Sequence, residues 1–289
     1  MLFLLYRIGI FVALRISLEK AYSIAATVGR IYSFFSFRDR QAVCDNLKTI
    51  FPEINKGEIS SMSREIFANF CKYLIDFFRF PLIDNDYIKK SVKIEGLENL
   101  DRSLAKKRGV ILVSAHLGNW ELGGGILSKL GYNLSAVVLR HRHKNVDDFF
   151  IQRRQILGMK AIPFGGALRR CFSILSENNI LALVGDRDYF DNGVQIPFFK
   201  KKTIIPKGPA VLSLRFGSPI IPTFMARNAD DTFTFKFYPP IEYALSGNKD
   251  RDIRFLTLNY LKVLEDVIRE YPTQWYVFRR FWERIGWRL

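Results

Sequence analysis

The stretch RGVILVSAHLGNWELGGGILSKLG, residues 108–131, contains an apolar run that stops at a histidine and passes at once into a helical pattern. Its first part, VILVSA, is rich in β-branched residues and has the length of one buried strand. The part that follows, NWELGGGILSKLG, has the apolar spacing of a helix. A strand that leads directly into a helix predicts one unit of an α/β sheet, with His116 at the carboxyl end of the strand.

The same alternation continues along the chain. Strand and helix patterns follow one another as strand 133–139, helix 147–158, strand 160–164, helix 167–178, strand 179–186, helix 208–217, and strands 218–226 and 232–241. This order predicts a layered α/β/α fold around a mixed, mostly parallel sheet. In such sheets ligands bind beyond the carboxyl ends of the strands, which is where His116 and Asp186 both fall.

The first 37 residues are strongly apolar but carry Arg7, Arg15, Glu19, Lys20 and Arg30. A membrane-spanning helix needs roughly 20 predominantly apolar residues, and a central arginine costs about 2.5–3.5 kcal/mol. These charges weigh against a simple transmembrane helix. A helix here would offer a broad apolar side either to a membrane surface or to the protein's own core, with a tilted anchor as a third alternative. We expect a helical segment at 1–37 and one larger domain at 38–289, which begins with helices over 38–83.

The composition favours anionic partners and a reducing compartment. The 289 residues carry a formal net charge of +16 with 48% hydrophobic residues, and this charge suits a membrane surface or nucleic acid equally. Three widely spaced cysteines, Cys44, Cys71 and Cys171, indicate reduced core residues and no metal site. The amino end lacks the pattern of a secretory signal.

The carboxyl end, EYPTQWYVFRRFWERIGWRL (residues 270–289), interleaves aromatic and basic residues. Such a pattern suits stacking on nucleic-acid bases, contact with lipid headgroups, or a terminal helix that packs its aromatic side chains on the core. The pattern alone leaves these three alternatives open.

His116 and Glu121 are the first candidates for chemistry. If the turn after the strand brings them together, Glu121 accepts a hydrogen bond from one imidazole nitrogen and leaves the other nitrogen as a free base. The alternative is an incidental loop histidine near a carboxylate that stabilises the start of a helix. The local pattern by itself favours this alternative.

A second group of charges, Asp186, Arg187 and Asp188, follows the strand pattern 179–186. They fit a charged turn better than a metal site, since no histidine or cysteine lies nearby. Of the adjacent arginines Arg153 and Arg154, only one can face inward from a helix. The motifs GxGxxG, GxxxxGK[ST] and GxSxG are absent from the sequence, so the glycine run at 123–125 indicates close packing rather than a phosphate loop.

These motifs together resemble the late acyltransferases of bacterial lipid A biosynthesis, the lauroyl and myristoyl transferases. HLGNWE, residues 116–121, matches an HxxxxE motif, where the wider superfamily that acylates glycerol phosphate usually has HxxxxD. Further landmarks occur in the order typical of the family: NLKTIFPEI, RRQILG, GDRDY, IPFFKKKTIIPKGPAVLSLRFGSPIIP and LEDVIREYPTQWYVFRRFW. The family commonly has Gln at the position of Arg187 and Gly at the position of Lys200, so this chain carries extra positive charge there.

The resemblance implies roles for individual residues. His116 corresponds to the general base and Glu121 to the carboxylate that orients it, and Arg154 and Asp186 are further catalytic residues. The residues expected to bind substrate are Asn119, Trp120, Arg187, Asp188 and Gly208.

The resemblance also implies an activity: transfer of a fatty acyl chain from an acyl carrier protein or coenzyme A thioester to a hydroxyl of a glycolipid. The expected acceptor is a lipid A precursor in lipopolysaccharide biosynthesis. The expected place is the cytoplasmic face of the bacterial inner membrane, with the segment 1–37 associating with the membrane. No cofactor, metal or nucleic-acid partner is implied. Two alternatives stay open: another acceptor, such as a phosphatidylinositol mannoside or an aminolipid, and an inactive basic protein that binds lipid or nucleic acid.

Overall fold

The computed structural model describes residues 2–141, 143–164, 167–189 and 192–283. Its centre is a seven-stranded sheet in the order β1-β9-β8-β2-β5-β3-β4. The strands are β1 (Val92–Glu95), β2 (Val110–Ser114), β3 (Leu134–Val138), β4 (Lys160–Pro163), β5 (Ile180–Val184), β8 (Ile220–Arg227) and β9 (Phe233–Phe237). All neighbours are parallel except β8 and β9, so the expected mixed, mostly parallel sheet is confirmed.

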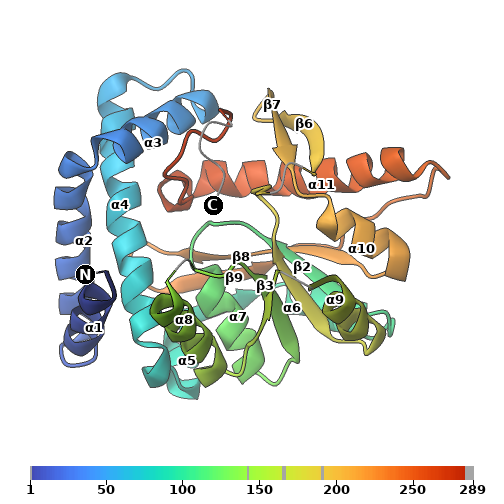
Figure 1. Cartoon of the computed structure of the whole chain (residues 1–289), viewed down its shortest axis with the longest axis horizontal. Helices are drawn as coiled ribbons and strands as arrows, with labels where there is room; N and C mark the ends of the chain where they lie inside the picture. Colours follow the sequence, from blue (N-terminus) through green and yellow to red (C-terminus); the bar gives the residue numbers. More distant parts are fainter. Residues whose placement is uncertain (1, 142, 165–166, 190–191, 284–289) are drawn as a thin grey trace.

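Helices cover both faces of the sheet (Figure 1). Side chains alternate along β2, and Ile111 and Val113 belong to a core shared with α9 (Ala167–Ser176), α10 (Gly208–Phe216) and α11 (Lys249–Glu270). Leu112 belongs to the core on the other face. The helices there are α5 (Asn85–Ser91), α6 (Leu97–Leu104), α7 (Trp120–Lys129) and α8 (Lys144–Ile156). Because both faces are buried, β2 reads as a continuous apolar run.

The glycine run at the start of α7 permits close packing, as expected. A Cβ at Gly125 would lie 2.3 Å from Leu157 Cδ1, and one at Gly124 would lie 2.6 Å from Met159 Sδ. Larger side chains at these positions would push α7 away from the segment that joins α8 to β4.

Four helices at the amino end stand beside the sheet: α1 (Leu2–Ala13), α2 (Leu18–Phe35), α3 (Phe37–Ile50) and α4 (Lys56–Phe78). In Figure 1, α2 runs along α4 on the side away from the sheet. The two helices approach closely, since a Cβ at Gly29 would lie 2.5 Å from the Phe67 carbonyl oxygen. The helical expectation for the amino-terminal part is confirmed. Within the described residues, none of the helices has both the length and the apolar character to cross a membrane.

Two elements lie outside the expected pattern. Strands β6 (Val194–Phe198) and β7 (Lys201–Ile205) form a two-stranded antiparallel hairpin. The long helix α11 packs on the same face of the sheet as α9 and α10. The terminal helix that was one of the alternatives for the carboxyl end does not form in the described residues. After a short 3-10 turn at Pro272–Gln274, the described residues 275–283 are not helical, and they bury Trp275, Tyr276 and Phe281. Of the three alternatives for this segment, packing on the core is therefore correct for the described residues. The remaining residues, 284–289, lie outside the described part.

Candidate active site

The carboxyl ends of two adjacent strands bring His116 and Asp186 together. Strands β2 and β5 are parallel, and Ser114 pairs with Val184, so the residues two positions further on lie side by side. His116 Nδ1 is 2.8 Å from Asp186 Oδ1. The Asp186 side chain is fully buried, whereas the His116 side chain keeps 22% of its surface exposed. The pair therefore consists of a buried carboxylate, that of Asp186, and an imidazole ring, that of His116, which solvent can reach.

The surroundings of Asp186 fix its charge. Its Oδ2 accepts hydrogen bonds from Trp275 Nε1 at 3.1 Å and from the His116 backbone N–H at 3.3 Å. Burial alone would raise the pKa of Asp186, but His116, Arg187 and Trp275 lower it by more, to well below its usual range. Because an ionised carboxylate only accepts hydrogen bonds, the proton of a neutral His116 lies on Nδ1, and Nε2 carries none and can accept one.

The pKa of His116 lies below its ordinary value of 6.5. Burial lowers the pKa most, the Arg187 guanidinium lowers it further, and Asp186 opposes both. At neutral pH the imidazole is therefore uncharged, the state that a general base requires.

Glu121 does not contact His116, although the resemblance implied that it orients the imidazole. Helix α7 begins at Trp120, and its first turn directs Glu121 toward α8, where Arg154 Nε donates to Glu121 Oε2 at 2.8 Å. A second contact joins Arg154 Nη2 to Glu121 Oε1, and both residues are buried. The carboxylate that holds the imidazole is Asp186, so the orienting role expected for Glu121 is corrected.

The Glu121–Arg154 ion pair ties α7 to α8. Breaking a buried pair by removing one partner typically costs about 3–5 kcal/mol, because an uncompensated charge is left inside. The neighbouring Arg153 is only half-buried and lies over the Phe149 ring, at 5.2 Å from its centroid. Only one of the two adjacent arginines faces inward, as expected.

The turn after His116 is held by segments distant in sequence. The His116 carbonyl accepts from the Tyr276 N–H at 2.8 Å, Gly118 N–H donates to the Gln274 carbonyl at 2.9 Å, and Asn119 N–H donates to the Met225 carbonyl at 2.8 Å. Gly118 has a φ of +62°, and a Cβ there would lie 2.0 Å from the Met225 oxygen. The turn thus requires glycine and sets the direction of α7.

Of the remaining residues that the sequence suggested, Trp120 and Arg187 lie beside the His116–Asp186 pair, whereas Asp188 and Gly208 have other surroundings. The Trp120 ring meets the His116 ring edge-on with 5.1 Å between centroids, and Arg187 Nε lies 3.7 Å from Asp186 Oδ2. Asp188 accepts from the Gly193 N–H at 2.9 Å and so stabilises its own loop. Gly208 is the exposed first residue of α10, and the contacts found among the described residues do not join it to His116.

Asn119 is a buried cap of α7 rather than an exposed group. Its Oδ1 accepts from the Leu122 N–H at 3.0 Å, and its Nδ2 donates to Asp76 Oδ2 at 2.7 Å. The sequence did not point to Asp76, nor to Trp275, which donates to Asp186. Trp275 lies within the aromatic and basic pattern at the carboxyl end, but only the folded chain places its indole beside a strand end.

Comparisons with known proteins identify the family and several relatives. A family model described as bacterial lipid A biosynthesis acyltransferase matches residues 1–284. The phosphatidylinositol mannoside acyltransferase of Mycobacterium tuberculosis is 29% identical over 220 residues, which are 73% of this chain and 67% of that protein. The lipid A biosynthesis palmitoleoyltransferase of Escherichia coli is 25% identical over 258 residues, 88% of this chain and 82% of that protein. The crystal structure of the 1-acyl-sn-glycerophosphate acyltransferase of Thermotoga maritima matches 88% of this chain and 99% of that one, at a TM-score of 0.39 and 14% identity. That likeness is too low to bear on fold or function.

Proposed function

This chain belongs to the bacterial lipid A biosynthesis acyltransferase family, and we propose that it moves a fatty acyl chain from a thioester donor to a hydroxyl of a glycolipid. The family membership confirms the resemblance seen in the motifs, and it makes the chain an acyltransferase. The observation that carries the proposal is the contact of 2.8 Å between His116 and a buried Asp186 at the carboxyl ends of β2 and β5.

In the proposed reaction His116 acts as the general base. Its Nε2 takes the proton of the acceptor hydroxyl while the hydroxyl oxygen attacks the thioester carbonyl carbon. Asp186 holds the tautomer and stabilises the imidazolium that forms. The carbon–sulfur bond then breaks, and the leaving thiolate takes the proton from His116. The products are an ester and a free thiol.

A negative charge develops on the thioester oxygen during this reaction and needs hydrogen-bond donors. Arg154 is an indirect contributor, because two of its donors already contact Glu121. The N–H groups of Trp120 and Glu121 lie in the first turn of α7, where the helix itself supplies no acceptor. We propose that this helix start, four and five residues beyond the base, stabilises the oxyanion.

The acceptor that we propose first is a lipid A precursor, because the family model carries that description over nearly the whole chain. The second candidate is a phosphatidylinositol mannoside, because the relative at 29% identity is named for that substrate. Both acceptors offer sugar hydroxyls and phosphate groups, which suit a chain with a net charge of +16.

A direct assay separates the two acceptors. Purified protein is incubated with acyl carrier protein or coenzyme A thioesters and with each acceptor in turn, and the products are identified by mass spectrometry. We expect acylation of the lipid A precursor with an ester in place of a hydroxyl. Acylation of the mannoside alone would replace the first candidate by the second. Absence of transfer to either acceptor would contradict the proposed reaction.

We also propose that the enzyme works at the cytoplasmic face of the bacterial inner membrane, and that the outer side of the amino-terminal helices makes the contact. The support is an outer apolar face of side chains that are each more than half exposed: Leu4, Ile8, Phe11, Ile24, Val28, Ile31, Tyr32, Phe34, Phe35 and Phe37. Two arginines, Arg15 and Arg40, lie against aromatic rings of this face. An apolar patch accompanied by cations is typical of surfaces that bind anionic lipid.

Charged substitutions on the outer apolar face are expected to weaken membrane binding. Burying one large apolar side chain contributes about 1.5–3 kcal/mol, so Phe35→Asp should lower partitioning into phosphatidylglycerol-containing vesicles by roughly tenfold or more. Vesicle flotation measures the effect. The control is Leu245→Asp, because Leu245 is 70% exposed but lies outside this face. Equal losses for both variants would argue against a specific contact.

A further inference from the structure

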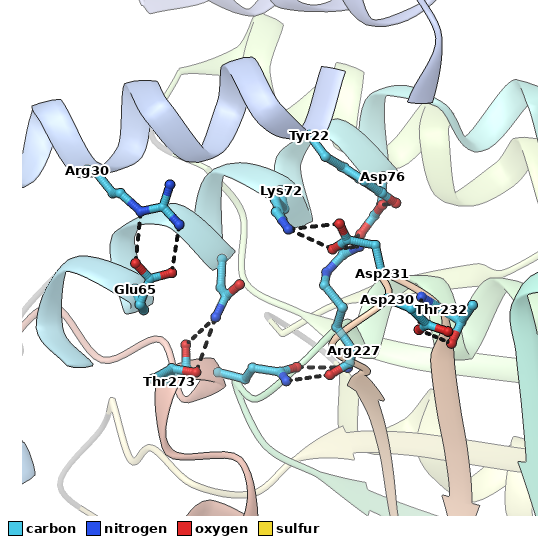
Figure 2. A network of polar contacts seen from close by, with 12 residues as sticks. Tyr22, Arg30, Glu65, Lys72, Asp76, Arg227, Asp230, Asp231, Thr232 and Thr273 are labelled. Carbon is cyan, nitrogen blue, oxygen red and sulfur yellow. Dashed lines mark hydrogen bonds and ion pairs between the residues drawn. The ribbon is translucent and has the colours of Figure 1, made fainter. Parts of the chain in front are cut away.

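Two polar contacts join α2 to α4. One is partly exposed to solvent, and the other connects to a buried group of polar side chains. Near the carboxyl end of α2, Arg30 forms an ion pair with Glu65, with Nε 2.8 Å from Oε1; both side chains are close to half exposed. This ion pair is in contact with solvent and, within the described residues, makes no connection to the buried polar groups around Asp76. Nearer the start of α2, the Tyr22 hydroxyl donates to Asp76, which is buried. Figure 2 shows both contacts, with the Tyr22 contact leading into a larger set of polar groups.

Asp76 is the centre of that set. Three donors converge on its carboxylate: the Tyr22 hydroxyl, the Arg227 guanidinium and the Asn119 side-chain amide, the last at 2.7 Å. They come from α2, from the end of β8 and from the cap of α7. We refer to Tyr22, Asp76, Asn119 and Arg227 as the Asp76 cluster. Because all four residues are buried, their hydrogen bonds are shielded from water and constrain position strongly.

The Asp76 cluster reaches the turn after His116 by two routes. In the first, Asn119 Oδ1 caps α7 at the Leu122 N–H, while its Nδ2 is held by Asp76. In the second, the Arg227 backbone exchanges two hydrogen bonds with the Gln274 side chain, at 2.8 and 2.7 Å. The Gln274 carbonyl in turn accepts from the Gly118 N–H at 2.9 Å. Gly118 and Asn119 are the second and third residues after the proposed base.

We propose that Asp76 is a positioning residue that couples the placement of α2 to the turn carrying His116. The proposal rests on the proposed acyl transfer for its kinetic readout. Its physical basis is that catalytic rates depend steeply on geometry, since a displacement of about 1 Å can cost 10²-fold. Helix α2 also carries much of the outer apolar face, so the cluster connects that face to the catalytic turn.

Two mild substitutions test this coupling. Tyr22→Phe removes one hydroxyl and keeps the ring, whose centroid lies 4.5 Å from the Arg227 guanidinium carbon. Asn119→Ser keeps a side-chain oxygen able to cap α7 but is too short to reach Asp76. We expect kcat to fall by about threefold to tenfold for Tyr22→Phe and by about 10- to 100-fold for Asn119→Ser, with smaller changes in KM.

The matched control is Arg30→Gln, which breaks the other contact between α2 and α4. Its kcat should stay within about twofold of wild type, because the Arg30–Glu65 pair is a partly exposed ion pair outside the cluster. If Arg30→Gln and Tyr22→Phe lower kcat equally, the effect is general loosening of α2, and the proposal fails. It also fails if Tyr22→Phe lowers only the melting temperature and leaves kcat unchanged.

The double variant distinguishes coupling from independent damage. If Tyr22 acts through Asp76, then Tyr22→Phe should lower kcat by a smaller factor when Asn119→Ser has already removed the first route. Multiplication of the two effects would overturn the proposal. If Asn119→Ser does not fold, the comparison of kcat between Tyr22→Phe and Arg30→Gln still tests the proposal.

Amide hydrogen exchange provides a readout that does not depend on the reaction. The Leu122 N–H donates to Asn119 Oδ1, so its exchange should be several-fold faster in Tyr22→Phe than in Arg30→Gln. Unchanged exchange would contradict the coupling even if the acyl acceptor has been assigned wrongly. Conversely, faster exchange in a protein that transfers no acyl group would leave the coupling standing and count against the proposed function.

Discussion

Replacing His116 by alanine is expected to lower kcat by on the order of 10²- to 10⁴-fold, the usual contribution of a positioned general base. The variant removes the imidazole that we propose as the base and leaves in place the N–H groups at the start of α7 that we propose as oxyanion donors. Its effect on folding should be modest, because the ring is partly exposed and the buried Asp186 keeps hydrogen bonds from Trp275 Nε1 and from the backbone N–H of residue 116. The measurement is thioester-dependent acylation of the lipid acceptor, with the melting temperature recorded in parallel.

The chain offers a matched control for this substitution. His143 is exposed at the start of α8 and makes no side-chain cap hydrogen bond, so His143→Ala should retain kcat within about twofold. Turnover by His116→Ala at the wild-type rate would remove His116 as the base. Equal losses for the two histidine variants would point to an unspecific effect.

Asp186→Asn is expected to have an effect of similar size, roughly 10²- to 10⁴-fold on kcat. The side chains have nearly the same shape, but the amide can donate to His116 Nδ1, which moves the ring proton to Nε2 and blocks the base. The corresponding substitution in serine protease triads acts in this way and costs about 10⁴-fold. The charge that stabilises the imidazolium is lost as well. Steady-state kinetics with saturating thioester measure the effect.

The companion variant Asp186→Ala tests whether activity depends on which nitrogen of His116 carries the proton. It removes the carboxylate without adding a donor, so neutral His116 can still present Nε2 as a base in one of its tautomers. We expect Asp186→Ala to retain at least as much activity as Asp186→Asn, provided that both variants fold. Wild-type kcat in Asp186→Asn would show that the pair seen in the structure is not part of the chemistry.

Much of the fold could be predicted from residues 108–131 and the alternation that follows. Strand β2 is apolar throughout because helices bury both of its faces, and such runs identify central parallel strands. The placement of His116 and Asp186 at strand ends was also predictable. Their direct contact depends on β2 and β5 being neighbours, and strand order follows from the packing of the whole sheet.

The partner of Glu121 could not be predicted in the same way. A separation of five residues across a strand end and a helix start leaves open which way the first turn faces. In the structure that direction is set by Gly118 and by Met225, a residue of β8 far away in the sequence. The choice between Asp186 and Glu121 as the partner of His116 is therefore a tertiary property.

The surroundings of the carboxyl-terminal segment could not be predicted from the sequence either. Its alternating aromatic and basic residues have the same pattern whether they meet lipid, nucleic acid or the core. Trp275 is buried with its indole N–H donating to Asp186, and the Tyr276 N–H donates to the His116 carbonyl. Such long-range partners leave no local signature in a single sequence.

The pH dependence of kcat/KM tests His116 as the base most directly. Activity needs the neutral imidazole, so the rate must fall as the pH drops through its pKa in the free enzyme. Burial and Arg187 lower that pKa below 6.5, and the wild-type profile should therefore show an acid limb centred below pH 6.5. The residual activity of His116→Ala should lack this limb. The same limb in His116→Ala would contradict the assignment of the base.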